Sequence, residues 1–523
     1  MAHISTLNPI MLSAKYDLYR LLQPSGMIYA SDDKQYRYAF FGRDSIEVAE
    51  DLLTHKGNYI ETLIVRLAEL QGVGYNEITE EEPGKIHHEY RADVMEGKTI
   101  PSFSKAILTS LSAIWGGTDK ELLYYGAADT TALYVRLVAR HNNLYKTDLL
   151  SREYTARDGM RYTIAHSVEK ALKWLEKKIE DQGFVTFCRT NPKGIICQVW
   201  KDSATSLVHV DGSHPNFKRP IATIELQAQA YDGLKLGSAL LETYGITDKK
   251  QVKKWNKLAD ELQERTLSIL WLPQVQRFAT GLDKTEDGKW RIISSNTSNQ
   301  GALLDSTILD TIDDITKQMY VQAIVKNLYS VAFLTPVGIR SQSLIEFPNI
   351  NFQDYHGAWT VWVKETYDVA KGFRRYGFNL LADQLELRIL NAIARAGSNR
   401  EFFYVIPTGQ VLYQPFRQYI WRGLALAKNT IEGATLPESG QAWSASAVYA
   451  IIATKSTKND QIPTAYTELE QTLYRFLPQV DQKTLMLSNR LIGFIASQGY
   501  AIDVVAGKYR DSNWRRSATK DDQ

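Results

Sequence analysis

Two acidic residues of this chain stand among aromatic residues, away from any obviously solvated helix face. Asp202 lies in the segment WKDS (200–203), and Glu401 lies in REFFY (400–404). A carboxyl group beside an aromatic ring can be partly desolvated, which raises its pKa and suits a general acid. Two such groups placed across one bond are what the hydrolysis of a glycoside requires. Taken singly, Asp202 fits a helix N-cap equally well, and Glu401 fits a salt bridge with Arg400.

Two further acids follow small residues and could bind hydroxyl groups. Arg43 and Asp44 follow Gly42, and together they offer donors and acceptors to a pair of vicinal hydroxyls. Asp129 follows two alanines and precedes two threonines, a pattern that also fits the start of a helix. Each of these patterns alone is compatible with a purely structural role.

Histidine and tryptophan residues mark three more segments. HHEYR (87–91) contains Glu89 and Arg91, but it lacks the His-Glu-x-x-His spacing of a zinc protease, so no metal is expected. His356 and Trp359 lie in YHGAW (355–359), and Trp443 lies in QAWS (441–444). The chain also lacks a phosphate-binding loop, a Gly-x-Ser-x-Gly elbow and a dinucleotide fingerprint, so no cofactor is expected.

The elements that must position these residues are predicted to be helices. Apolar residues recur at helical spacing in 58–71, 165–181 and 379–396, and Gly183 and Gly397 stand where the last two helices should stop. About a dozen such segments are spread evenly, with no linker between them. A length of 523 residues exceeds the size at which one core usually stops growing. We therefore expect an all-α domain over 1–507, in which helix pairs pack around an axis.

Connections between the helices are long, and we expect them to build a pocket at one end. They cover 72–101, 187–220, 283–304, 336–358 and 397–411. Within them, 183–189 and 194–200 predict a short β-hairpin around Asn191-Pro192-Lys193-Gly194. The polar residues 508–523 are expected to form a C-terminal tail.

The composition excludes several classes of function. The net charge is only +2, which argues against nucleic acid or an anionic membrane as partner. No run of eighteen apolar residues exists, and no signal peptide is recognisable. The two cysteines, Cys188 and Cys197, could bridge the hairpin, but so few thiols in so long a chain favour a reducing, cytoplasmic location. We expect a monomer or a weak homo-oligomer.

Taken in order, these segments resemble one family, the glycogen-debranching amylo-α-1,6-glucosidases of bacteria and archaea. They are also similar to glucoamylases and to the mannosylglycerate and glucosylglycerate hydrolases. The segments that carry the resemblance are FGRDS (41–45), GKIHHEYR (84–91), YYGAAD (124–129), WKDS (200–203), ELQ (225–227), SNQG (298–301), the stretch from YHG (355–357) to Trp362, EFF (401–403) and QAWS (441–444). They span most of the chain.

The resemblance implies an (α/α)6 toroid, also called a six-hairpin glycosidase, and hydrolysis with inversion. By position in the motifs, Asp202 would be the general acid and Glu401 the general base, with Glu438 as the alternative base. Arg43 and Asp44 would hold the glucose that is released. The remaining residues implied to bind a small saccharide or a glucan are Glu89, Arg91, Asp129, Trp200, Lys201, His356, Trp359 and Trp443.

This chain also departs from the family pattern. The β-rich N-terminal domain typical of debranching enzymes is missing, which favours a short oligosaccharide or a glucoside over a polymer. A hydrolase of glucosylglycerate, trehalose or sucrose on the same fold is therefore an alternative. A sugar 2-epimerase that uses histidines, and a sugar-binding protein without activity, are two further alternatives.

Overall fold

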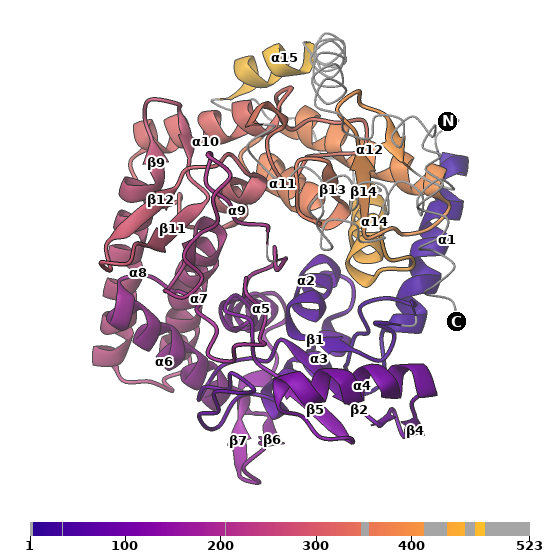
Figure 1. Cartoon of the computed structure of the whole chain (residues 1–523), viewed down its shortest axis with the longest axis vertical. Helices are drawn as coiled ribbons and strands as arrows, with labels where there is room; N and C mark the ends of the chain where they lie inside the picture. Colours follow the sequence, from indigo (N-terminus) through magenta and orange to yellow (C-terminus); the bar gives the residue numbers. More distant parts are fainter. Residues whose placement is uncertain are drawn as a thin grey trace, which may run out of the picture.

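The computed structural model describes residues 4–33, 35–203, 205–346, 355–412, 437–455 and 466–475. These residues are mainly helical, and the helices are arranged in a ring, with several small antiparallel sheets between them (Figure 1). The prediction of a helical toroid is confirmed at this level. The predicted tail, 508–523, lies outside the described residues. No described helix has both the length and the apolarity needed to cross a membrane.

An inner layer of helices closes on itself. Neighbours pack in the order α2, α5, α7, α9, α11 and α14, and α14 then packs against α2. A helix that is apolar around its circumference belongs in an interior, and α5 and α7 are buried on nearly all sides. The bounds of these helices are Gly42–Leu52 (α2), Thr130–Tyr145 (α5), Ile224–Thr243 (α7), Ala302–Asp305 (α9), Val363–Arg375 (α11) and Ala442–Lys455 (α14).

An outer layer alternates with the inner one along the chain. In α6, Val168, Leu172 and Leu175 are buried on one face, as the helical spacing predicts. Gly183 and Gly397 end α6 and α12 with φ of 79° and 69°, which confirms both predicted stops. The outer helices are α1 (Ile4–Leu21), α3 (Gly57–Glu69), α6 (Ile164–Gln182), α8 (Lys249–Leu270), α10 (Asp314–Leu328) and α12 (Asn379–Ala396), whereas α4 (Ser102–Trp115) and α15 (Thr467–Arg475) fall outside the alternation.

Short strands lead directly into the inner helices. β1 (Phe40–Phe41) runs into α2, β8 (Ala222–Thr223) into α7, and β13 (Thr360–Trp362) into α11. Each of these strands belongs to a three-stranded sheet, and the strand orders are β1-β2-β5, β12-β11-β8 and β13-β14-β15. The other strands of these sheets are β2 (Glu89–Ala92), β5 (Glu121–Tyr124), β11 (Gly281–Lys284), β12 (Trp290–Ile293), β14 (Phe402–Val405) and β15 (Val411–Leu412). The register pairs Phe41 with Glu89 and Val361 with Phe403. The start of each of these helices is thus fixed at one end of the ring.

The remaining strands form two-stranded hairpins on the outside. They are β3 (Val94–Met95) with β4 (Lys98–Thr99), β6 (Glu153–Thr155) with β7 (Arg161–Thr163), and β9 (Trp271–Leu272) with β10 (Arg277–Phe278). Phe278 of β10 is nevertheless buried in the core, where it packs against Tyr320.

The first and last inner helices are joined by backbone contacts between the two ends of the ring. Ser31 forms a β-bridge with Gln441, and the amide of Ala442 donates to the carbonyl of Ala30 at 2.8 Å. The outer helix α1 also packs along α14. The ring is therefore closed by segments that lie more than four hundred residues apart in sequence.

The β-hairpin predicted over 183–200 is wrong. Phe187 forms its backbone bridge with Ile221 instead, and residues 190–198 form turns. Their amides are satisfied by side chains, since Glu80 accepts from the amide of Thr190 at 2.8 Å and Tyr124 accepts from that of Ile195 at 2.9 Å. Backbone donors that have side-chain partners do not need a second strand. Cys188 and Cys197 are not joined in a disulfide.

Candidate active site

A cavity of about 380 Å³ lies at the end of the ring where the strands enter the inner helices. Its lining comes from segments far apart in sequence, and four of the five predicted long connections supply lining residues. The lining residues are Ala30, Ser31, Gln35, Tyr36, Phe41, Arg43, Asp44, His88, Glu89, Arg91, Ile107, Leu111, Trp115, Ile195, Trp200, Asp202, Tyr355, His356, Trp362, Glu401, Glu438, Gln441 and Trp443. Both predicted catalytic acids are among them.

Asp202 is held at the cavity wall by a buried arginine. Nη1 of Arg43 lies 3.5 Å from Oδ2 of Asp202, while Nε of the same guanidinium donates to Oδ2 of Asp129 at 2.8 Å. The side chain of Asp202 is 32% exposed, and it is exposed to the cavity that it lines. Burial raises the pKa of Asp202 to about 6, although Arg43 opposes the change. Such a carboxyl can carry or release a proton near neutral pH.

Glu401 is oriented through both of its carboxylate oxygens. The hydroxyl of Tyr355 donates to Oε1 at 2.6 Å, and the amide of Glu438 donates to Oε2 at 3.1 Å. Burial raises the pKa of Glu401 to about 8; the bond from Tyr355 lowers it, and the neighbouring Glu438 carboxylate raises it further. A fixed carboxylate of high pKa is a strong base once it is ionised.

Glu438 and Asp44 are two further acids of the cavity. Oε2 of Glu438 accepts from the hydroxyl of Ser31 at 2.9 Å, and burial raises the pKa of Glu438 to about 7. Asp44 lies in the first turn of α2, and burial raises its pKa to about 7 as well, against the pull of Arg43. The cavity therefore gathers four acids whose pKa values all lie above their usual range.

Arg91 and Glu89, both on strand β2, form an ion pair. The guanidinium of Arg91 also donates to the carbonyl of Gln35 at 3.0 Å, so two of its nitrogens already have protein acceptors. Both side chains line the cavity. They suit recognition of hydroxyl groups more than capture of a free anion, because the charge of Arg91 is already balanced.

An aromatic wall completes the site. The ring of His356 stacks on Trp362 at a centroid distance of 4.8 Å, and Trp200 meets His356 edge-on at 5.2 Å. Burial holds the pKa of His356 well below its usual range, so this ring is neutral. Trp443 packs edge-on to Trp362 at 5.6 Å. Aromatic rings of this kind can pack against the apolar face of a sugar ring.

Three predicted binding residues do not line this cavity. Asp129 is completely buried behind Arg43, which it holds in place, and its charge helps to raise the pKa of Asp202. Lys201 points inward, where its ammonium donates to Ser298 Oγ and to the carbonyl of Ser341, each at 2.8 Å. Trp359 lies in the core, and Trp362 takes its place on the wall. Successive side chains of strand β13 point to opposite faces, so residues 360 and 362 share one face and residue 361 lies on the other. The sequence motif alone does not show which of the two tryptophans faces the cavity.

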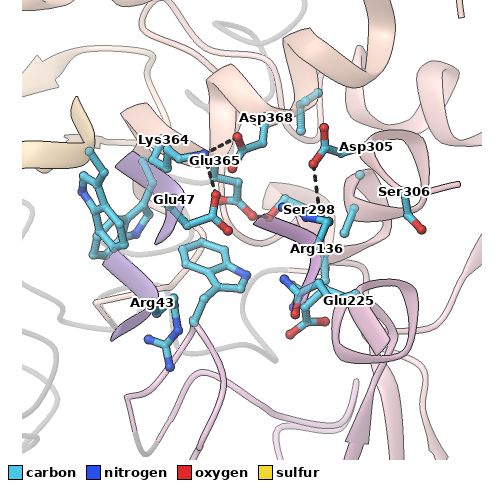
Figure 2. Close-up of a pocket in the computed structure, with 18 residues that line it drawn as sticks. Arg43, Glu47, Arg136, Glu225, Ser298, Asp305, Ser306, Lys364, Glu365 and Asp368 are labelled. Atoms are coloured by element: carbon cyan, nitrogen blue, oxygen red, sulfur yellow. Dashed lines mark hydrogen bonds and ion pairs between the residues drawn. The ribbon is translucent and has the colours of Figure 1, made fainter. Parts of the chain in front are cut away.

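Below the cavity, the inner helices enclose a network of ion pairs (Figure 2). Lys364 lies 2.9 Å from Glu47 and also pairs with Asp368, and Arg136 lies 3.5 Å from Asp305. Burial alone would raise the pKa of Glu47, but Lys364 and Arg136 outweigh it and lower this pKa to about 2. The pKa of Asp305 is lowered as well, against its burial, by Lys371 and Arg136, so Glu47 and Asp305 are ionised near neutral pH.

Known proteins resemble this chain in structure rather than in sequence. No protein-family model matches it, and no curated protein matches it. Solved structures do share its fold. They include an uncharacterised conserved protein from Thermus thermophilus, with 14% sequence identity and a TM-score of 0.52, covering 85% of this chain and 99% of that one.

Two further matches are named as glycosidases. A GH63 mannosylglycerate hydrolase from Thermus thermophilus, in complex with Tris and D-glycerate, has 15% identity and a TM-score of 0.52, covering 85% of this chain and 100% of that one. A structure described as a wild-type glycosidase has 10% identity and a TM-score of 0.51, covering 86% and 97%. At these identities the likeness establishes the fold. The chain has the helical-ring fold of these glycosidases.

Proposed function

We propose that this protein is an inverting glycoside hydrolase that cleaves an α-glucosidic bond on an (α/α)6 toroid. The observation that carries the proposal is that Asp202 and Glu401, from distant segments, line one cavity beside Arg43 and Asp44. The fold shared with glycosidases supports it. So does the aromatic wall, which offers a sugar ring an apolar surface.

In the proposed reaction, Asp202 protonates the glycosidic oxygen while Glu401 removes a proton from a water molecule on the opposite face of the sugar. An inverting enzyme keeps its two carboxyl groups about 6.5–9.5 Å apart to admit that water. Tyr355 and the amide of Glu438 fix the direction of the Glu401 carboxylate, and Arg43 fixes that of Asp202. Each acid–base group should contribute about 10²–10⁴-fold to the rate.

The order of the two pKa values decides how abundant the productive protonation state is. A pKa of about 6 for Asp202 and about 8 for Glu401 places a single shared proton mainly on Glu401. The productive form has that proton on Asp202, and a difference of two pKa units makes it about one part in a hundred of the singly protonated enzyme. Since the singly protonated enzyme is most abundant between these two pKa values, kcat/KM should be bell-shaped with limbs near 6 and 8.

The substrate is proposed to be a short glucoside or oligosaccharide of the kind that amylo-α-1,6-glucosidases and their relatives process. One matching structure is named as a mannosylglycerate hydrolase, and another structure of that enzyme contains glucose. Those names support a small saccharide for this chain. In this chain the charge of Arg91 is balanced by Glu89, which favours a neutral leaving group over glycerate.

A substrate panel tests the proposal. The protein is incubated with maltose, isomaltose, panose, trehalose, sucrose and glucosylglycerate, and released glucose is measured, with proton NMR recording its anomeric form. We expect at least one of them to yield β-glucose first, which establishes inversion. First release of α-glucose contradicts inversion. Binding by calorimetry without any glucose release points to a sugar-binding protein instead.

The epimerase alternative has weaker support at this site. His88 and His356 line the cavity, and burial holds the pKa of each well below its usual range. A histidine that shuttles protons works best with a pKa near the ambient pH. The same panel, extended to free glucose and N-acetylglucosamine, reports any epimerisation directly.

A further inference from the structure

A second cavity lies behind the proposed active site. It has a volume of about 80 Å³ and is enclosed by the inner helices α2, α5, α7, α9 and α11. Arg43, Trp200, Trp362 and Trp443 line both cavities, so these four side chains form the wall between them. The inner cavity is therefore a separate chamber that the proposed reaction does not use.

In the part of the chain that the structure describes, most of the carboxylates that line the inner cavity are paired with cations, but one is not. Three cationic side chains and five carboxylates line it, and four of the carboxylates have ion-pair partners. Glu47 and Asp368 pair with Lys364, Asp305 with Arg136, and Glu365 with Lys201. Among the described residues, the fifth carboxylate, Glu225, has no ion pair, and no dashed line reaches it in Figure 2.

Glu225 is also poorly hydrogen-bonded. It is only 1% exposed, and neither of its carboxylate oxygens accepts a hydrogen bond within 3.5 Å from any described residue. Burial raises the pKa of Glu225, and Asn299, Thr223 and the Lys201 ammonium lie near enough to oppose this rise in part. A buried carboxylate with no ion pair within 4.0 Å and no hydrogen bond within 3.5 Å is costly, so its charge calls for further compensation.

Unpaired oxygen atoms gather beside Glu225. Gln229 follows it by one helical turn on α7, so both side chains lie on one face, and the Oε1 atom of Gln229 accepts no bond from the described residues. Asn299, from the 3-10 helix η2 (Ser298–Gly301), is 3% exposed and has both Oδ1 and Nδ2 unpaired within the described part of the chain. Two unpaired donors, Nη2 of Arg43 and Nε1 of Trp443, belong to the wall on the active-site side.

We propose that this chamber binds a monovalent metal cation, held by the Glu225 carboxylate and by the amide oxygens of Gln229 and Asn299. Hard cations take oxygen ligands, and one carboxylate with neutral oxygens supplies the single negative charge that a potassium or sodium ion balances. The described residues contain no group of three or more acidic, histidine or cysteine side chains that could hold a metal, which argues against a divalent or transition metal. The proposal is independent of the proposed hydrolase activity.

Thermal unfolding of the full chain tests the proposal without any activity measurement. Tm is recorded in KCl, NaCl and RbCl against choline chloride at the same ionic strength, since choline is too large for the chamber. We expect at least one metal salt to raise Tm by about 2 °C at a hundredfold excess over its Kd. Equal Tm values in all four salts would overturn the proposal.

Two variants locate the effect. Glu225→Gln removes the charge and nearly keeps the shape, so it should abolish the salt-specific rise in Tm. Glu242→Gln makes the same change at an exposed position of the same helix, and it should keep the rise. If Glu225→Gln keeps the rise, the cation binds elsewhere and the proposal fails.

A crystallographic measurement decides the case even where Glu225→Gln does not fold. Wild-type crystals soaked in thallous or rubidium salt should give an anomalous peak between Glu225, Gln229 and Asn299. Density for water alone at saturating cation would overturn the proposal. It would mean that Glu225 is protonated and that water fills the chamber.

Discussion

Two groups of buried carboxylates lie one above the other in the same ring. The pKa values of one group are raised above their usual range, and those of the other group are lowered. At the cavity, burial raises the pKa of Asp44 and Glu438 to about 7 and that of Glu401 to about 8. In the ion-pair network below, the pKa of Glu47 falls to about 2, and that of Glu50 is lowered as well. Burial by itself would raise the pKa of the carboxyl groups in both places.

The difference lies in the cations. Lys364 and Arg136 reach the lower carboxylates. At the cavity, Arg43 acts on Asp202 and Asp44 but is already engaged by Asp129, and Glu401 and Glu438 have no ion pair with any described residue. Asp51 is an exception in the lower network, because burial, with a smaller contribution from Asp368 and Glu47, keeps its pKa at about 6 although Lys364 and Lys371 both lie beside it. Desolvation is common to both regions, and the supply of positive charge decides whether a carboxyl serves structure or chemistry.

The largest expected effect is a loss of activity that distinguishes the proposed general acid from the proposed general base. Asp202→Asn should lower kcat/KM on an O-glucoside by about 10²–10⁴-fold, because the leaving oxygen is no longer protonated. On α-glucosyl fluoride, whose leaving group needs no proton, the same variant should keep most of its activity. Glu401→Gln should lose activity on both substrates. Steady-state kinetics on the two substrates provides the measurement.

Two outcomes contradict this assignment. Near-wild-type turnover by Asp202→Asn on every O-glucoside removes the role of Asp202. If Glu401→Gln is the variant that fluoride rescues, the two roles are exchanged, as the order of the pKa values by itself would suggest.

The next effect concerns stability in the lower network. Lys364→Met should reduce the free energy of unfolding by about 3–5 kcal/mol, because it leaves Glu47 without its ion-pair partner and leaves Asp368 with Lys371 alone. Lys289→Met breaks a pair with Asp287 whose lysine side chain is 81% exposed, and it should leave stability unchanged. Denaturant unfolding of both variants makes the comparison; equal losses would show that the network is not structural.

A smaller effect is expected from removing the hydroxyl that orients Glu401. In Tyr355→Phe the pKa of Glu401 should rise, because the bond that favours its ionised form is lost. The alkaline limb of the kcat/KM profile should then move to higher pH, and the rate near neutrality should fall about tenfold. Tyr134→Phe removes a buried hydroxyl bonded to Ser167, away from the cavity, and should leave the pH profile unchanged. An unmoved limb in Tyr355→Phe would mean that this limb does not report Glu401.

The smallest effect concerns Glu438. Its folded-state pKa of about 7 lies above the ordinary value, so its contribution to stability is complete at low pH and is lost as pH rises through about 7. Glu438→Gln should therefore raise Tm at pH 8 by about 1 °C and change it less at pH 5. Its activity should remain within about tenfold of wild type. A loss as complete as that of Glu401→Gln would make Glu438 the base.

Much of the fold could be predicted because it follows local patterns. The stripe of α6 and the glycine stops at 183 and 397 follow from helical geometry alone. Helix α1 was not predicted, since Pro9 lies within it and its face is mixed. The hairpin failed because its backbone donors are satisfied by Glu80 and Tyr124, which lie far away in sequence.

The site could be predicted as a set of motifs but not as a set of roles. Asp202, Glu401, Arg43 and Asp44 do line one cavity, as their motifs indicated. The inward direction of Lys201 depends on Ser298 and Ser341, and the orientation of Glu401 depends on Tyr355. Tyr36 had no signal of its own, because a tyrosine in a loop carries no information about a site until the tertiary structure encloses it.

The backbone bridge that joins residues 30–32 to residues 440–442 has a consequence for synthesis. A ribosome must translate more than four fifths of the polypeptide before the last inner helix can close the ring, so the nascent chain exposes apolar helix faces for a long time. Folding intermediates with an open ring should depend on chaperones. A circular permutant that covalently links the native ends and opens the chain between α6 and α7 would let the closing helices emerge together.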